Sequence, residues 1–267
     1  MGDPARPVRQ DSPWLRRYEP RPGAGARIIC FGPAGASPGF FRGWSGLAPA
    51  DVDVQILAYP GRERRALEPP LEEMAALTEA VHDVLAPRID RPTVLFGHSM
   101  GASVAFETAR LLEASGARPL AGLVVSGRPG PRVLRELPPA VTGFDDERTV
   151  AYVRSLGGTP PELLDDPEAR EVILPAFRSD FRLTGRYTPE LTPRVRAPLT
   201  VLCGDRDTRV STEGAQCWNE VADHFTGVER LSGGHFYLVE EARAVVEAVM
   251  RPFAPPRPLA PAADRAV

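Results

Sequence analysis

The stretch Thr93-Val94-Leu95-Phe96-Gly97-His98-Ser99-Met100-Gly101-Ala102-Ser103 begins with an apolar run that ends at Gly97 and continues with small, helix-forming residues from Gly101. These patterns predict a buried strand followed at once by a helix. Ser99 lies at the turn between them, in the G-x-S-x-G arrangement of a nucleophile elbow. Glycine at both flanking positions avoids clashes with neighbouring backbone, so we expect Ser99 to project its hydroxyl at the helix N-terminus. The alternative is an ordinary strand-to-helix turn in which the serine only caps the helix.

A nucleophilic serine needs a general base, and the chain contains only four histidines. His82 precedes the serine within an apolar-periodic helix, and His98 belongs to the elbow, where its side chain points away from that of Ser99. His224 lies at the end of the helical stretch 214–223. His235 follows a short strand and a glycine-rich loop, and it is the expected base in the chain order serine, acid, histidine.

Two aspartates are candidates for the acid that orients this histidine. Both follow the apolar segment 198–203, which has the composition of a buried strand. Asp205 is placed to accept hydrogen bonds from turn amides, whereas the carboxylate of Asp207 lies further out, where it could reach Nδ1 of His235. The interval from either aspartate to His235 fits one helix and one strand. The interval from Ser99 is too long for two α/β units, so it predicts an insertion.

The composition excludes several classes of protein. The chain has 267 residues, 43% hydrophobic and 25% charged, as in an ordinary globular domain. A net charge of −3 argues against nucleic acid as a partner, and no apolar run approaches the roughly 20 residues of a membrane span. Three cysteines and an N-terminus without an apolar signal segment predict reduced thiols and a cytoplasmic location. All 32 basic residues are arginines, which excludes lysine Schiff-base chemistry and a P-loop.

Strand and helix patterns alternate along the chain. Strands are predicted at 27–31, 53–58, 93–97, 121–125, 199–203 and 227–231. This alternation is typical of an α/β fold with a mainly parallel, doubly wound sheet. The stretch of about 132–196 carries helical patches and is expected to form a helical lid over the active site. We expect residues 1–26 to be a flexible N-terminal segment, 27–251 a single domain, and 252–267 a disordered Pro-rich tail.

Acyl transfer through a serine also needs donors for the oxyanion of the tetrahedral intermediate. The backbone N–H of Met100, at the start of the helix after Ser99, is one expected donor. The second is expected from the loop Cys30-Phe31-Gly32-Pro33-Ala34-Gly35-Ala36-Ser37, where small residues let the backbone approach a substrate oxygen. The alternative for this loop is a Gly/Pro turn without a catalytic role.

Five further motifs accompany the elbow Gly97-His98-Ser99-Met100-Gly101-Ala102 between about Ile28 and Val249. They are Cys30-Phe31-x-x-Ala34-Gly35, Tyr59-Pro60-Gly61-Arg62-Glu63-x-Arg65, Asp180-Phe181-Arg182-Leu183, Gly204-Asp205-x-Asp207 and Gly233-Gly234-His235-Phe236. Together they resemble the type II thioesterases that accompany polyketide and nonribosomal peptide assembly lines, a family with the α/β-hydrolase fold. The chain departs from that family in the first loop, where Gly32-Pro33-Ala34-Gly35-Ala36 stands in place of the common Pro-His or Pro-Tyr followed by Ala-Gly-Gly.

The resemblance implies a serine thioesterase that hydrolyses acyl thioesters on the phosphopantetheine arm of acyl or peptidyl carrier proteins and so removes stalled or wrongly primed chains. It favours Asp207 as the acid beside Ser99 and His235, and Ala34 as the second oxyanion donor beside Met100. It implies no metal ion and no cofactor, because phosphopantetheine arrives as part of the substrate. It is also compatible with a monomer.

Carrier proteins are generally acidic, so basic residues near the pantetheine entrance are the candidates for docking and substrate binding. These are Arg62, Arg64, Arg65, Arg178 and Arg182. The alternative for each of them is a solvated surface charge or an internal ion pair.

Three other functions remain open at this point. A general serine carboxylesterase or lipase would share the catalytic residues. A stand-alone thioesterase could release a finished pathway product instead of editing. A catalytically silent carrier-binding protein could keep the fold, although it would have no need of a complete set of serine, aspartate and histidine.

Overall fold

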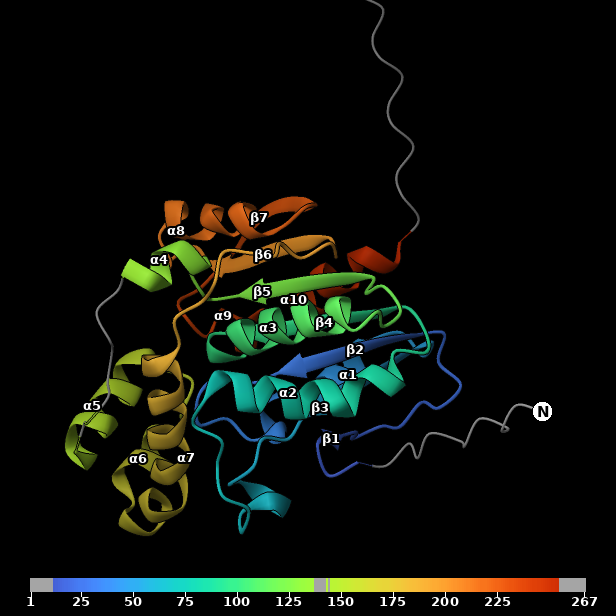
Figure 1. Ribbon diagram of the computed structural model, residues 1–267. Coiled ribbons are helices and arrows are strands. Elements are labelled where there is room, and N and C mark those ends of the chain that lie inside the picture. Colours follow the sequence, from blue (N-terminus) through green and yellow to red (C-terminus); the bar gives the residue numbers. More distant parts are fainter. Residues whose placement is uncertain (1–11, 137–142, 144, 255–267) are drawn as a thin grey trace, which may run out of the picture.

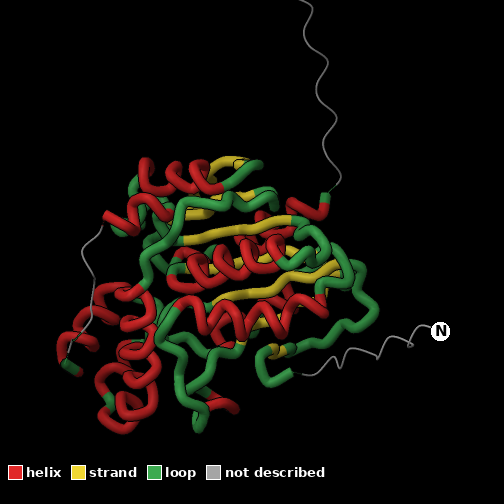
Figure 2. Tube along the Cα trace, in the orientation of Figure 1, coloured by secondary structure: helices red, strands yellow, loops and turns green. Residues whose placement is uncertain are grey.

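The computed structural model describes residues 12–136, 143 and 145–254. Seven strands in this part of the chain form one sheet in the order β1-β3-β2-β4-β5-β6-β7 (Figures 1 and 2). They are β1 (Leu15–Arg16), β2 (Ala26–Phe31), β3 (Val52–Leu57), β4 (Thr93–His98), β5 (Gly122–Ser126), β6 (Leu199–Gly204) and β7 (Phe225–Leu231). All neighbouring strands are parallel except β1 and β3. The predicted α/β fold with a mainly parallel sheet is confirmed, and each of the six predicted strands lies within two residues of its expected bounds.

Helices cover both faces of the sheet, and two hydrophobic cores result. On one face α2 (Met74–Leu85) and α3 (Met100–Ala114) pack against the strands, and on the other face α1 (Trp44–Leu47) and α10 (Ala242–Met250) do so. The strands β3, β4 and β5 are buried throughout, as expected of parallel strands covered on both sides. The last helical part of the described chain is divided into α9 (Tyr237–Glu240), α10 and a 3₁₀ turn at Arg251–Phe253.

The described part of the segment between β5 and β6 contains four helices: α4 (Pro131–Glu136), α5 (Asp146–Leu156), α6 (Pro161–Asp165) and α7 (Pro167–Arg186). In Figure 1 helices α5, α6 and α7 stand together beside the end of the sheet toward which β2 and β5 point. They have a small core of their own, formed by Val150, Val153, Leu164, Leu174, Phe177 and Phe181. The helices therefore lie at the carboxyl ends of the strands, where ligands bind in open α/β sheets. Two more short elements, α8 (Thr212–Gln216) and a 3₁₀ helix at Cys217–Val221, follow β6.

Residues 12–26 are packed against the sheet, which corrects the flexible segment expected for 1–26. Strand β1 pairs with β3, and the N–H of Ala58 donates to the carbonyl of Trp14 at 2.8 Å. The guanidinium of Arg21 donates to the carbonyls of Ala48 at 3.0 Å and Val52 at 3.1 Å. Residues 1–11 lie outside the described part of the chain.

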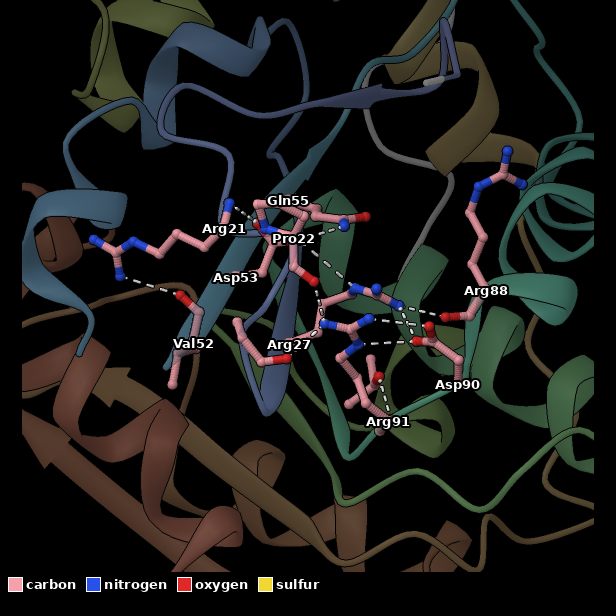
Figure 3. A network of polar contacts seen from close by, with 11 residues as sticks. Arg21, Pro22, Arg27, Val52, Asp53, Gln55, Arg88, Asp90 and Arg91 are labelled. Atoms are coloured by element: carbon pink, nitrogen blue, oxygen red, sulfur yellow. Dashed lines mark hydrogen bonds and ion pairs between the residues drawn. The ribbon is translucent and has the colours of Figure 1, made fainter. Parts of the chain in front are cut away.

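A buried polar network fixes this segment at the amino ends of the strands (Figure 3). Asp53 is 1% exposed and accepts hydrogen bonds from the N–H of Arg21 and from Nε2 of Gln55, at 3.2 and 2.6 Å. Arg27 lies 3.8 Å from the same carboxylate and 3.1 Å from that of Asp90. A two-residue strand has no periodicity to detect, so only these contacts with distant residues reveal that the segment belongs to the fold.

The other end of the domain also extends beyond the expected boundary. Pro252 and Phe253 were expected in a disordered tail, but they continue the 3₁₀ turn, and Phe253 packs against the core next to α10. Residues 255–267 lie outside the described part. The cysteines Cys30, Cys203 and Cys217 are buried and form no disulfide, in agreement with the predicted reduced thiols. Within the described residues no helix is both long and apolar enough to cross a membrane.

Candidate active site

The elbow between β4 and α3 has the close packing that its two glycines predict. A Cβ atom on Gly97 would lie 2.1 Å from the carbonyl oxygen of Gly101, and one on Gly101 would lie 2.1 Å from that of Phe31. Ser99 has φ 53° and ψ −117°, a conformation that non-glycine residues rarely adopt and that is costly. The fold imposes this strain, and the serine hydroxyl is presented between the end of a buried strand and the first turn of a helix.

Ser99, His235 and Asp207 form a continuous hydrogen-bonded chain. His235 Nε2 lies 3.2 Å from Ser99 Oγ, and its Nδ1 lies 2.9 Å from Oδ2 of Asp207. The Asp207 side chain is 0% exposed and that of His235 8%. An ionised carboxylate only accepts hydrogen bonds, so Nδ1 of His235 carries the proton and Nε2 is free to accept one from the serine hydroxyl. This is the arrangement in which a histidine can deprotonate a serine.

The two candidate aspartates have separate roles. Asp205 Oδ1 accepts a hydrogen bond from the N–H of Gly233 at 2.8 Å, so it fixes the loop that carries His235. Asp207 contacts the imidazole directly and also accepts from the N–H of Arg209 at 2.9 Å. The structure thus brings Asp207, rather than Asp205, to the histidine.

A second histidine, His98, lies buried behind the first. Its Nδ1 is 2.8 Å from Oγ of Ser126, which is 2.7 Å from the hydroxyl of Tyr237, and its ring centroid is 5.0 Å from that of His235. Complete burial, together with the neighbouring His235, lowers the pKa of His98 well below its ordinary value of 6.5. His98 is therefore neutral at neutral pH. Its contact with Ser126 joins two strands, a role that the position of His98 in the elbow motif does not disclose.

Burial of neutral His98 predicts a specific pH dependence of stability. The unfolded chain protonates this histidine below about pH 6.5 whereas the folded chain does not, so stability is present above that pH and is lost as the pH falls toward the folded pKa. We expect the free energy of unfolding to fall by about 1 kcal/mol more in the wild type than in His98→Gln between about pH 7 and 5.5, measured by urea unfolding. Equal losses in both proteins would contradict this role of His98.

The residues of the two expected oxyanion donors line the same cavity as Ser99. Met100 is the first residue of α3, and the N–H groups of a first helical turn have no acceptor within the helix. Ala34 lines the same cavity from the loop after β2. The assignment of these two N–H groups as oxyanion donors stays a prediction.

A buried ion pair attaches this loop to helix α7. Arg62 donates through Nη1 and Nη2 to the two carboxylate oxygens of Asp180, at 2.9 and 2.8 Å, and both residues are less than 10% exposed. Asp180 Oδ2 also accepts from the N–H of Gly35 at 2.7 Å, and Arg62 donates to the carbonyl of Ala36 at 3.0 Å. These contacts hold the backbone directly after Ala34. We call Arg62, Asp180, Gly35 and Ala36 the loop clamp.

Packing supports the loop clamp from both sides. Gly35 has φ +73°, and a Cβ atom there would lie 2.3 Å from the ring of Phe177 on α7, so only glycine fits. The hydroxyl of Tyr59 donates to the carbonyl of Gly32 at 3.3 Å, and the Arg62 guanidinium lies 5.0 Å from the Tyr59 ring centre. By contrast, a Cβ atom on Gly32 would make only ordinary contacts, the nearest at 3.4 Å with Ala36. The departure from the family pattern at Gly32 is therefore sterically undemanding.

Two of the arginines expected at a docking surface are buried instead. Arg62 belongs to the loop clamp. Arg65 is 5% exposed, binds Glu68 at 2.6 Å, donates to the carbonyl of Ala58 and stacks 3.8 Å from the ring centre of Trp14. Neither guanidinium is offered to a protein partner. The expectation for these two is corrected, because their charge is needed inside the fold.

The remaining three candidates lie nearer the surface. Arg64 is exposed. Arg178 is paired with Asp146 of the neighbouring helix α5, and Arg182 with Glu72 at 2.6 Å, so both connect helix α7 to other segments. Their side chains are 37% and 40% exposed. Of these three arginines, Arg64 is the one that is exposed and not held in an ion pair within the described residues.

A cavity of about 870 Å³ opens above Ser99 and His235. Its apolar wall comes from the inserted helices and includes Val153, Leu156, Leu163, Ile173, Phe177 and Phe181. Polar groups are fewer, among them Arg128, Tyr152 and Tyr187. In the described ranges no three His, Cys, Asp or Glu side chains are grouped so that they could hold a metal ion. The site is thus a serine, a base and an acid beneath a chamber suited to an acyl chain.

Comparison with known proteins agrees with this geometry. The model of the thioesterase domain family matches residues 26–253. The chain belongs to the thioesterase family. Over 94% of its length it is 40% identical to a probable cadicidin biosynthesis thioesterase of Streptomyces griseus, of which the match covers 68%.

Two solved structures of type II thioesterases share the fold. The type II thioesterase BorB from the borrelidin biosynthetic cluster matches with a TM-score of 0.80 and 36% identity, over 91% of this chain and 98% of its own. The type II thioesterase YbtT from the yersiniabactin NRPS/PKS pathway matches with a TM-score of 0.80 and 33% identity, over 90% and 98%. The expected resemblance to type II thioesterases and the α/β-hydrolase fold are confirmed.

Proposed function

We propose that this thioesterase hydrolyses acyl thioesters carried on the phosphopantetheine arm of an acyl or peptidyl carrier protein, and that it clears stalled or wrongly primed chains in polyketide or nonribosomal peptide biosynthesis. The observation that carries the proposal is the chain Ser99–His235–Asp207 at the floor of a large, mostly apolar cavity. The similarity of the whole chain to type II thioesterases of such pathways supports the choice of substrate.

The first half of the proposed reaction transfers the acyl group to Ser99. The serine oxygen attacks the thioester carbonyl carbon while Nε2 of His235 takes the hydroxyl proton, and Asp207 stabilises the imidazolium that forms. The tetrahedral intermediate then expels the pantetheine sulfur, which takes the proton from Nε2. The products of this half are the acyl-serine and the free thiol on the carrier protein.

The second half releases the acid. Nε2 of His235 takes a proton from water, and the resulting hydroxide attacks the ester carbonyl of the acyl-serine. Collapse of this second intermediate returns the proton to Ser99 Oγ and releases the carboxylic acid. Both intermediates carry an oxyanion, and the N–H groups of Ala34 and Met100 are the proposed donors, each lowering the barrier by about 3–4 kcal/mol. The reaction as written uses no metal ion or cofactor.

The function is tested with a matched panel in which each short acyl group is presented as a carrier-protein thioester, a free pantetheine thioester and an oxygen ester. We expect the highest kcat/KM for the carrier-bound thioesters, because docking of the carrier adds binding energy that the free thioester lacks. A preference for the oxygen esters would identify a general esterase instead. Equal rates on carrier-bound and free thioesters would remove the carrier protein from the proposal.

A further inference from the structure

Arg128 is a cavity arginine that has no acidic partner among the described residues. Arg128 follows β5 and lines the cavity above Ser99. Its Nε donates to Oγ of Ser103 at 3.2 Å, and its carbonyl accepts from the indole N–H of buried Trp218 at 2.8 Å. Among the described residues no carboxylate lies within ion-pair distance of its guanidinium. The backbone and Nε are thus fixed, while the two terminal amino groups are uncommitted.

Two other arginines at or near the site are bound to protein partners. Arg62 donates through both terminal amino groups to Asp180. Arg209, which also lines the cavity, donates to the hydroxyls of Tyr152 at 3.0 Å and Ser155 at 3.2 Å. Burial lowers the pKa of Arg128. The nearby hydroxyls of Tyr187 and Tyr152 offset only part of this effect, and no carboxylate contributes.

An unpaired guanidinium is costly to keep in an apolar cavity, because an arginine side chain stays charged and its N–H groups need acceptors. No hydrogen bond joins Arg128 to the Tyr187 hydroxyl, which donates to Glu107 at 2.6 Å, and Glu107 is also paired with Arg110. The terminal N–H groups of Arg128 therefore remain open to a ligand in the cavity.

Two contacts place Arg128 beside the elements that carry Ser99 and His235. Ser103, which holds Nε, stands one turn of α3 beyond Ser99, or about 6 Å along the helix. Gly127, directly before Arg128, packs against the catalytic loop: a Cβ atom there would lie 3.3 Å from Cε1 of His235. An acyl chain attached to Ser99 would therefore pass the guanidinium with its first few carbons.

We propose that Arg128 binds an oxygen atom of the acyl chain, so that the protein favours acyl groups with a keto, hydroxyl or carboxylate oxygen in the first few carbons over hydrocarbon acyl groups of equal length. This inference rests on the proposed thioesterase function and names its substrate class. An oxygen acceptor completes the hydrogen bonding of the guanidinium, whereas a plain hydrocarbon chain leaves it desolvated and unpaired.

The test compares four-carbon pantetheine thioesters: butyryl, 3-hydroxybutyryl, 3-oxobutyryl and succinyl, each corrected for its spontaneous hydrolysis. In the wild type we expect kcat/KM for at least one oxygen-bearing substrate to exceed that for butyryl by about 10-fold or more. The neutral and anionic members distinguish a keto or hydroxyl ligand from a carboxylate. In Arg128→Met this preference should fall at least about 10-fold, and Arg128→Lys, which keeps the charge, should retain part of it.

Arg209→Met is the matched control, because it removes a cavity arginine whose N–H groups are already engaged, and it should keep the wild-type preference. A structural role for Arg128 is separated by thermal unfolding: removal of an unpaired charge should leave the melting temperature of Arg128→Met equal or higher. An equal loss on all four substrates would overturn the inference, since Arg128 would then contact the pantetheine or the fold. A wild type that hydrolyses all four thioesters at the same rate overturns only this inference, whereas failure to hydrolyse any of them, either as pantetheine or as carrier-protein thioesters, overturns the proposed function itself.

Discussion

Ser99→Ala is expected to lower kcat for acyl-thioester hydrolysis by a factor on the order of 10⁴ to 10⁶. Without Oγ no acyl-enzyme can form, and His235 and Asp207 have no nucleophile to activate. Alanine keeps the Cβ atom, so the positive φ at position 99 is no more strained than with serine. Thermal unfolding of the variant should therefore match that of the wild type.

The measurement is the release of free thiol from a carrier-bound acyl thioester, accompanied by labelling with a fluorophosphonate probe of active-site serines. Ser45→Ala is the control, because Ser45 is a buried serine on α1 that does not line the cavity. This control should hydrolyse the substrate and take up the label like the wild type. Retained turnover or labelling in Ser99→Ala would show that the nucleophile is another residue.

Asp180→Asn is expected to act on stability and on rate together. The variant leaves the buried guanidinium of Arg62 without a counter-charge, which costs about 3–5 kcal/mol of unfolding free energy. It also weakens the hydrogen bond of Gly35, whose N–H in the wild type donates to the Asp180 carboxylate at 2.7 Å. Since Ala34 precedes Gly35, a displaced loop removes one oxyanion donor, and kcat should fall about 10²- to 10³-fold.

A double variant separates the two effects. Arg62→Leu combined with Asp180→Leu replaces the buried ion pair with apolar side chains, which is often neutral for stability. We expect it to recover most of the unfolding free energy but not kcat, because the N–H of Gly35 and the carbonyl of Ala36 still lack their partners. Arg182→Met is the control on the same helix: its ion pair with Glu72 is half-exposed, so its loss should cost under about 1 kcal/mol. Full recovery of kcat in the double variant would contradict the role of the loop clamp.

Local patterns in the sequence were enough to predict the sheet, the elbow and the order of the candidate catalytic residues. The apolar runs that became β4, β5 and β6 carry their signal within a few residues, because a strand covered on both faces is largely apolar along its length. The need for glycine at 97 and 101 is likewise a property of one tight turn. His235 could be chosen because few histidines compete with it.

Tertiary structure alone decided how distant polar residues pair. The sequence suggested a surface cation at Arg62, but in the fold its guanidinium is buried in an ion pair with Asp180, 118 residues later. Residues 12–26 looked flexible, but β3 and Asp53 hold them. The sequence did not single out Arg128, because only the folded structure shows that no carboxylate of the described residues lies within ion-pair distance of its guanidinium. Strand and turn preferences are local and can be read from neighbouring residues, whereas the partner of a buried charge depends on which segments the folded chain brings together.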